Sequence, residues 1–273
     1  MALHSAIITV MQKAAEKAGR KLSRDFGEVE HLQVSRKGPA DFVSAADTRA
    51  EKIIFEELSR ARPDFGFLME ENGEIEGNDK STRWIIDPLD GTTNFLHSIP
   101  HFCTSIALEQ NGEITAGLLY LPLTDETYWA EKGRGAYLGN RRLRVSSRKN
   151  MADSLLATGI PFKGRAGHAE FIASLETIMP EVAGVRRFGS AALDLAYVAA
   201  GRYDGFWETE LQPWDIAAGL LLVSEAGGQV TTFDGKKDVL DGKQILATNG
   251  ALHGPVTRLL ATARKNVRKS ATR

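Results

Sequence analysis

The sequence predicts a mixed α and β protein whose two halves are organised differently. In the first half, two helical segments are followed by strand-like segments that Asn-Gly and Pro-containing turns separate, a pattern typical of helices packed on an antiparallel sheet. In the second half, strand-like and helical segments alternate, which favours an α/β lobe. A polar, basic stretch at 141–153 marks the expected boundary, so a single unit of residues 1–273 would comprise lobes 1–145 and 146–273.

The first lobe is predicted to begin with two helices. Apolar residues spaced four apart, from Ala6 to Ala18, share one helical face, and this helix is expected to end near Phe26. A second helix is predicted over about 46–62 and is stopped by Pro63. Strands are predicted at 65–69, 84–86, 103–108, 114–121 and 127–131.

The second lobe is predicted to alternate strands with helices. Strands are expected at 155–157, 184–188 and 204–207, and helices at 170–178, 191–200 and 216–226. The basic, polar tail from Ala263 to Arg273 is expected to fray.

Composition narrows the functional classes. The 273 residues carry a net charge of −1, so the chain as a whole has no electrostatic preference for nucleic acid or an anionic membrane. No run of about 20 apolar residues is present, and the N-terminal segment reads as an amphipathic helix, so we expect no membrane association. Cys103 is the only cysteine, which excludes an internal disulfide and fits a cytoplasmic protein.

The segment from Trp84 to Asn94 carries the sharpest chemical signal. An apolar strand ends in Asp87 and Asp90, with Pro88 fixing a turn between them and Gly91 permitting an unusual backbone dihedral. The two carboxylates can therefore converge, with a backbone carbonyl between them, as an oxygen-rich site for a hard cation such as Mg²⁺. The residues that follow open a short helix whose free N–H groups suit a phosphate. The competing interpretation is an exposed Asp-Pro turn.

Three further acidic residues are candidates for the same site, and each has a plainer interpretation. Glu70 closes an apolar strand, where ligands collect in α/β sheets, but it also fits an acidic loop. Asp215 follows Pro213 in the first turn of a helix, where it complements the helix dipole without any other role. Asp47 lies at the start of the second helix, and nothing local distinguishes it from a helix cap.

A glycine turn precedes the helix predicted at 191–200. The run Gly189-Ser190-Ala191 is another potential anion site, although it is weak alone. Arg186 and Arg187 just before it are compatible with phosphate contacts, with an interface or with a solvated surface.

Taken together, these segments closely resemble the inositol monophosphatase family, within the group that includes fructose-1,6-bisphosphatases and bisphosphate nucleotidases. The resemblance extends from Lys37 to Gly228, and the run from Gly189 to Glu208 is most similar to the bacterial inositol-1-monophosphatase branch. It implies a layered α/β/α/β/α sandwich, usually a homodimer, and a Mg²⁺-dependent phosphatase that hydrolyses a small phosphate monoester. Myo-inositol monophosphate is the expected substrate.

The resemblance also implies roles for individual residues. A first Mg²⁺ would be held by Glu70, Asp87 and the Leu89 carbonyl, a second by Asp87, Asp90 and Asp215, and a weaker third ion would lie near Glu70. Thr92 and Asp47 would form a hydrogen-bonded pair that orients the attacking water. The residues that would contact the substrate are Leu89, Asp90, Gly91, Thr92, Arg186, Gly189, Ser190, Ala191, Glu208 and Asp215. Met69 stands where the family usually has glycine, which puts the third ion in question.

Two alternatives stay open at this level. The substrate could instead be fructose 1,6-bisphosphate, a nucleotide 3′-phosphate or histidinol phosphate. Some bacterial relatives also act as partners of RNA-processing or transcription machinery, and the basic tail permits such a contact here without arguing for it.

Overall fold

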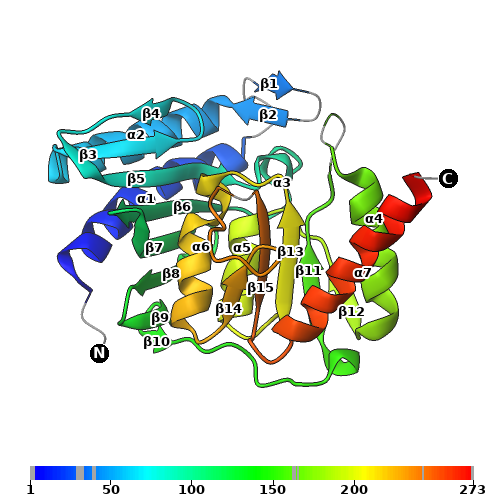
Figure 1. Ribbon diagram of the computed structural model, residues 1–273. Helices are drawn as coiled ribbons and strands as arrows, with labels where there is room; N and C mark the ends of the chain where they lie inside the picture. The colour runs from blue at the N-terminus through cyan, green and yellow to red at the C-terminus, as the bar shows by residue number, and fades with distance from the viewer. Residues whose placement is uncertain are drawn as a thin grey trace.

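The computed structural model of the protein describes residues 4–28, 34–38, 41–161, 164, 166–241 and 243–271. Helices and two extended sheets are stacked in alternating layers (Figure 1). This arrangement matches the α/β/α/β/α sandwich implied by the family resemblance. A separate two-stranded hairpin, β1 (Val34–Gly38) with β2 (Asp41–Ser44), leads into α2.

The larger sheet has eight strands in the order β10-β9-β8-β7-β6-β5-β3-β4. Its pairs are antiparallel apart from β3 with β5, which run parallel. The strands are β3 (Phe65–Met69), β4 (Gly73–Ile75), β5 (Asp79–Asp90), β6 (Cys103–Gln110), β7 (Glu113–Leu121), β8 (Glu126–Glu131), β9 (Gly135–Leu138) and β10 (Arg141–Arg142). The helices α1 (Ala6–Phe26) and α2 (Ala45–Ala61) cover one face of this sheet, where Trp84 and Met11 are fully buried.

The smaller sheet has five strands in the order β12-β11-β13-β15-β14. The strands β12, β11 and β13 run parallel to one another, and β15 is antiparallel to both of its neighbours, β13 and β14. The strands are β11 (Leu155–Thr158), β12 (Gly184–Arg186), β13 (Gly205–Thr209), β14 (Gln229–Thr231) and β15 (Gln244–Thr248). The helices α4 (His168–Ile178) and α7 (His253–Ala271) pack on its outer face, with short 3₁₀ turns at Met151–Asp153 and Met179–Glu181.

Two apolar helices lie between the sheets and join them. These are α5 (Ala191–Ala199) and α6 (Pro213–Glu225), and their side chains form one core with residues of both sheets. The packing is close, because a β-carbon added at Gly117 of β7 would lie 2.9 Å from the backbone of Ala218 in α6. Since the central layer is shared, both sheets and both helices contribute to one continuous core around the site described below.

The C-terminal segment corrects one expectation. The tail was expected to fray from Ala263, but α7 continues through Ala271, and the last two residues lie outside the described part of the chain. The reason is amphipathicity: Val256, Leu260 and Ala263 lie on one buried face that packs on the smaller sheet. Basic side chains occupy the exposed face, and composition alone concealed this periodicity. The strands β14 and β15 were not predicted either.

Candidate active site

A β-bulge brings the two aspartates of the central motif to the same side of the sheet. Residues three apart on a regular strand face opposite sides. In β5, however, Asp87 pairs with Ser105 and Asp90 with Cys103, so three steps on one strand match two on its neighbour. The extra residue restores the same orientation for both carboxylates. The predicted convergence therefore occurs, but through a bulge that the sequence did not reveal.

The turn at the bulge is held by two local hydrogen bonds and by the conformation of Gly91. The Thr104 hydroxyl donates to the Pro88 carbonyl over 2.9 Å, and the Leu89 N–H donates to an Asp87 oxygen over 2.9 Å. Gly91 then adopts a left-handed conformation with φ of 97°, where an added β-carbon would also lie 3.0 Å from the His101 carbonyl. This glycine starts the five-residue helix α3 (Thr92–Leu96). The end of β5 is therefore fixed in shape.

Glu70 lies at the same edge of the sheet, because β3 runs parallel to β5 and ends beside it. Its backbone N–H donates to the Ile86 carbonyl over 3.2 Å. The next turn is anchored by Glu51 of α2, a fully buried carboxylate that accepts the N–H groups of Glu71 and Asn72 at 2.9 and 3.0 Å. Glu51 is a supporting residue that the sequence analysis did not identify.

Asp47 and Thr92 form the expected pair. The Thr92 hydroxyl lies 3.0 Å from an Asp47 oxygen and 3.1 Å from the Leu89 carbonyl. Asp47 is in the first turn of α2 and is fully buried, so its carboxylate is held in place. The pair ties α2 to the start of α3, next to the bulge.

The second lobe is attached directly to this motif. Asp90 accepts hydrogen bonds from the Ser190 hydroxyl and, over 2.8 Å, from the Ala192 N–H, so a carboxylate of the first lobe caps α5 in the second. Asn94 donates to the Phe188 carbonyl over 2.7 Å. Gly189 lies between these contacts with φ of 84°. These bonds set the position of the Gly189–Ala191 turn relative to the two aspartates.

Asp215 performs the capping role that its position suggested. Its Oδ2 accepts the Gln212 N–H over 2.7 Å at the start of α6, where Pro213 is the first helical residue. It also lines the same cavity as Asp87 and Asp90, and its charge contributes to raising the pKa of Asp87. The two interpretations are therefore compatible, and the cap orients the carboxylate beside the motif.

One cavity of about 170 Å³ collects most of the candidate residues. Among those predicted, it is lined by Glu70, Asp87, Leu89, Asp90, Gly91, Thr92, Gly189, Ser190, Ala191, Glu208 and Asp215. Asp47 stands behind Thr92 rather than on the surface of the cavity. Arg186 lies outside, at the exposed end of β12, and Arg187 lines the cavity instead. Met69 points into the apolar core of the first lobe, 2% exposed, and does not line the cavity.

The electrostatics of the cavity favour a cation. Burial raises the pKa of Asp87 well above its ordinary value, and the charges of Glu70, Asp90 and Asp215 raise it further. Burial also raises the pKa of Asp90 to about 6, although hydrogen bonds from Ser190 and Ala192 oppose the shift. Buried carboxylates that repel one another are stabilised by a bound cation.

The donor set fits a hard cation such as Mg²⁺, because four carboxylates and the Leu89 carbonyl supply only oxygen. Within the described residues, no three acidic, histidine or cysteine side chains are already gathered around one point. A bound cation would remove the repulsion among these carboxylates. The set is therefore chemically suited to the ion without being closed around it.

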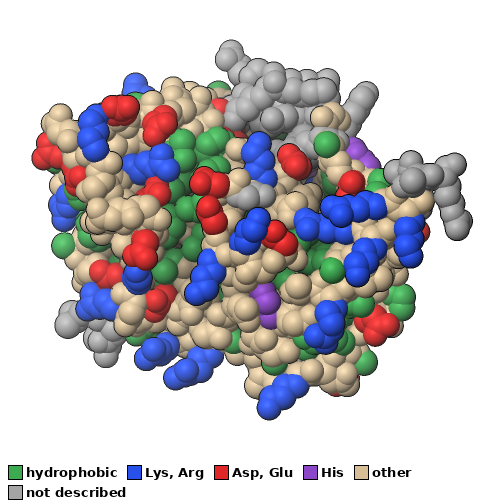
Figure 2. Space-filling view, viewed as in Figure 1, with side chains coloured by type: hydrophobic (Ala, Val, Ile, Leu, Met, Phe, Trp, Pro, Cys, Tyr) green, Lys and Arg blue, Asp and Glu red, His purple; other side chains and the backbone are tan. Residues whose placement is uncertain are grey.

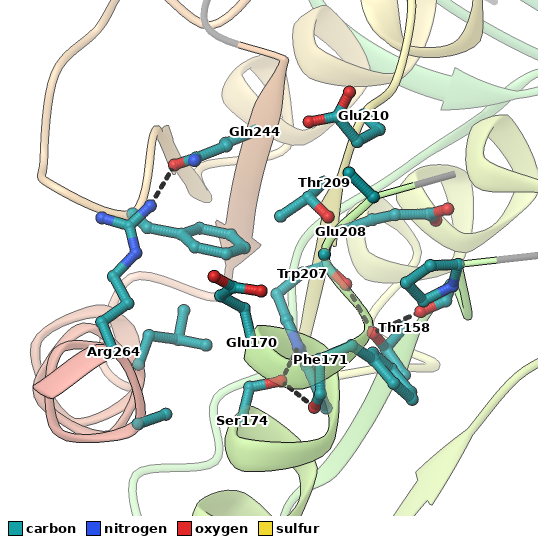
Figure 3. Close-up of a pocket in the computed structure, with 17 residues that line it drawn as sticks. Thr158, Glu170, Phe171, Ser174, Trp207, Glu208, Thr209, Glu210, Gln244 and Arg264 are labelled. Atoms are coloured by element: carbon teal, nitrogen blue, oxygen red, sulfur yellow. Dashed lines mark hydrogen bonds between the residues drawn. The ribbon is translucent and has the colours of Figure 1, made fainter. Parts of the chain in front are cut away.

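A second, more apolar cavity of about 280 Å³ adjoins the first along β13 (Figure 3), and both are lined by Gly159, Pro161, Glu208, Thr209 and Glu210. Figure 3 shows Trp207, Phe171 and Ser174 on its wall, with Arg264 and Gln244 at the far end. The Glu208 carboxylate extends away from Arg264 and Gln244 in this view, as expected for neighbours that alternate along a strand. The carboxylate cluster lines the smaller cavity and not this one.

Among the lining residues of the smaller cavity that sequence reasoning missed, Gly159 and Asp194 matter most to the argument. Gly159 follows β11, and a β-carbon there would lie 1.9 Å from the Glu208 carboxyl carbon, so this carboxylate is packed directly on the glycine. Asp194 interrupts the apolar helix α5 and lines the cavity while 1% exposed. A charged residue flanked by leucines in a buried helix was a signal available in the sequence. The importance of Gly159 depends on a contact across β11 and β13 that only the fold reveals.

Comparisons with known proteins identify the family to which the chain belongs. The family model described as "Inositol monophosphatase family" matches residues 3–268. The chain is 61% identical to an inositol-1-monophosphatase of Mesorhizobium japonicum over 90% of this chain and 92% of the relative. It is 42% identical to the Nus factor SuhB of Escherichia coli over 89% and 91%. A crystal structure of the extragenic suppressor protein SuhB from Bartonella henselae superposes with a TM-score of 0.92 at 58% identity, covering 94% of this chain and 98% of the other. The chain therefore belongs to the inositol monophosphatase family of phosphatases.

Proposed function

We propose that this protein is a Mg²⁺-dependent phosphatase that hydrolyses a small phosphate monoester, with myo-inositol monophosphate as substrate. The observation that carries the proposal is the convergence of Glu70, Asp87, Asp90 and Asp215 on one cavity, where their mutual repulsion calls for a cation. The names of relatives at 55–61% identity support the substrate.

The metal-binding residues are assigned as follows. Glu70, Asp87 and the Leu89 carbonyl would hold one Mg²⁺, and Asp87, Asp90 and Asp215 a second. A third, weaker ion would lie near Glu70, and the burial of the Met69 side chain in the core leaves the approach to Glu70 clear of it. Bound Mg²⁺ would neutralise the phosphate dianion, promote ionisation of water and stabilise the leaving alkoxide.

The protein itself would position the reactants. Thr92, held by Asp47 at 3.0 Å, would accept a hydrogen bond from the attacking water while it donates to the aspartate. The backbone N–H groups of Gly91 and Thr92 would take phosphate oxygens at the start of α3. On the other side of the cavity, Glu208 and the Gly189–Ala191 turn would face the alcohol part of the substrate.

A phosphate-release assay tests the proposal. Purified protein stripped of metal with EDTA should release no phosphate from inositol 1-phosphate, and MgCl₂ should restore turnover. A substrate panel should then rank inositol 1-phosphate above fructose 1,6-bisphosphate, a nucleotide 3′-phosphate and histidinol phosphate in kcat/KM. Preference for one of the latter would keep the phosphatase assignment and replace the substrate.

Further proposals concern the oligomeric state of the enzyme and its location in the cell. Family resemblance supports a homodimer, which sedimentation or light scattering would test. The described residues contain no helix that is long and apolar enough to cross a membrane. The single cysteine, Cys103, is buried and unpaired, which supports a cytoplasmic location.

A second role as a partner of transcription machinery is favoured by one observation, the 42% identity to a protein named Nus factor SuhB. Basic side chains also gather on the side of the molecule where α7 lies (Figure 2), including the exposed Lys265, Arg268 and Lys269. A pull-down with the Asp87→Asn protein would test this role independently of catalysis. Capture of components of the transcription machinery would support it, and their absence would refute it.

A further inference from the structure

Asp194 is a buried carboxyl group with no partner in the described part of the chain. It lies one turn into α5 and is 1% exposed. Its Oδ1 is shielded from solvent and makes no hydrogen bond. Its backbone N–H is satisfied by the Ser190 carbonyl at 3.0 Å, so the helix itself does not need the side chain. An unpaired buried carboxyl costs folding free energy and calls for an explanation.

The side chain lies at the cavity assigned to the substrate. Asp194 lines it together with Glu208 and Ser190. Its neighbours in the helix, Leu193 and Leu195, are fully buried in the shared core. Asp194 lies between them in sequence but lines the cavity. No cation contacts it among the described ion pairs, although the charge of Arg187 acts on it from the rim.

We propose that Asp194 is a second substrate-reading carboxyl group, which with Glu208 holds hydroxyl groups on the alcohol part of the phosphate ester. The inference rests on the proposed function and deepens it. It assigns as substrate class a polyol phosphate carrying at least two free hydroxyls, rather than a simple alkyl or aryl phosphate. Each carboxyl would bind one hydroxyl, and a rotation of the Asp194 side chain on substrate binding would bring its shielded Oδ1 to the cavity and give it a partner.

The chemistry of the group suits a hydroxyl ligand. Burial raises the pKa of Asp194 well above its usual range, and the charges of Glu208 and Asp90 add to this effect while Arg187 opposes it. A neutral carboxyl both donates and accepts a hydrogen bond, as a hydroxyl group does. Glu208 is only half-buried. The two carboxyls would therefore differ in solvation while reading the same alcohol.

Tyr203 offers an alternative explanation for the buried Asp194, and the experiment must distinguish it from a substrate contact. Its hydroxyl is also buried and unpaired, and burial raises its pKa while the charge of Asp194 raises it further. A buried water shared by Asp194 and Tyr203 would satisfy both without any role for substrate. Tyr203 does not line the cavity. Removing its hydroxyl therefore breaks a structural water site but leaves a substrate contact of Asp194 intact.

The test compares Asp194→Leu with Tyr203→Phe on two substrates. The quantity measured is kcat/KM for inositol 1-phosphate divided by kcat/KM for phenyl phosphate, which has no free hydroxyl. Asp194→Leu should lower this ratio about fivefold to tenfold, mainly through KM for the polyol, as expected for one lost hydrogen bond. Asp194→Asn should recover part of the ratio, because an amide still donates and accepts. Tyr203→Phe should leave the ratio unchanged.

The thermal stability of the Asp194 variant is the second quantity to be measured. Because an unpaired buried carboxyl is costly, the Tm of metal-free Asp194→Leu should equal or exceed that of the wild type. If the leucine variant fails to fold, Asp194→Ala replaces it in the kinetic comparison. An unchanged ratio in an active Asp194 variant would overturn the inference alone, and so would an equal fall in Tyr203→Phe. A wild type that hydrolyses neither ester would instead refute the proposed function and the inference that depends on it.

Discussion

Replacing Gly159 by alanine should remove the Glu208 carboxylate from the substrate cavity without unfolding the protein. An added β-carbon would lie 1.9 Å from the carboxyl carbon and one oxygen of Glu208 and 2.2 Å from the other oxygen. These separations are far below van der Waals contact, so one group must move. Gly159 has an ordinary backbone conformation, and the obstructing atoms are the end of a flexible side chain. The carboxylate, rather than the backbone, should therefore yield.

The size of the effect follows from what Glu208 is assigned to do. A hydrogen bond from a substrate hydroxyl to a carboxylate contributes about 1.5–3 kcal/mol. Its loss should lower kcat/KM for inositol 1-phosphate by about 10- to 150-fold, since about 1.4 kcal/mol corresponds to a factor of ten. Phenyl phosphate offers no such hydroxyl, so the loss on that substrate should be much smaller.

A double-mutant cycle tests whether Gly159→Ala acts only through Glu208. If Gly159→Ala acts only by displacing Glu208, then adding it to Glu208→Ala should cause almost no further loss, because the methyl group then meets empty space. The single variants and the double variant should have similar kcat/KM values for the polyol. Gly27→Ala is the matched control, since a β-carbon there makes only an ordinary 3.5 Å contact with the Arg24 carbonyl and Gly27 does not line the cavity. Additive effects of the two mutations would refute the displacement mechanism.

Three further predictions concern the metal site and the fold. LiCl should inhibit turnover more than NaCl or KCl at matched ionic strength, because Li⁺ resembles Mg²⁺ in size but has half its charge; equal inhibition by all three salts would contradict this. Apparent Mg²⁺ affinity, measured by calorimetry, should rise between about pH 5.5 and about pH 8, because protons compete for Asp90, whose pKa is raised to about 6, and for Asp87, whose pKa is also raised; a flat profile would count against these ligands. Leu260→Ala, at a site 1% exposed, should lower the free energy of unfolding by about 2–5 kcal/mol in urea titrations, whereas a frayed C-terminal tail would show no change.

The sequence predicted those parts of the fold that local patterns determine. The strand Phe65–Met69 and the helix ending at Phe26 were predicted with their observed limits, because apolar periodicity and a following turn define them. The helix α7 was misjudged, since its small apolar face is diluted by basic residues. The strand β14 has only three residues, too few to show a period, and it forms because it extends the sheet edge at β15. The strand β15 was missed although it has five residues, and its place between β13 and β14 is determined by strand pairing.

The residues of the candidate site also divide into those that a local motif predicted and those that only the fold brings together. Asp87, Asp90 and Gly91 were found because they are adjacent in one motif. Their convergence nevertheless depends on a bulge between β5 and β6, which is a property of strand pairing and not of the motif. The contact between Gly159 and Glu208 joins residues 49 positions apart in sequence, and no local pattern could have predicted it. Asp194 was visible in the sequence as a charged residue in an apolar helix, but the sequence did not show that its side chain lines the cavity.

The most direct test of the central claim is Mg²⁺-dependent phosphate release by the wild type and by Asp87→Asn. The substitution is nearly isosteric and removes one negative charge from a residue 2% exposed that is assigned to both metal sites. The wild type should release phosphate from inositol 1-phosphate only when MgCl₂ is present. The variant should fold with an unchanged circular dichroism spectrum and show no measurable turnover in saturating MgCl₂. Near-normal kcat in the variant, or full activity of the wild type in EDTA, would contradict the account.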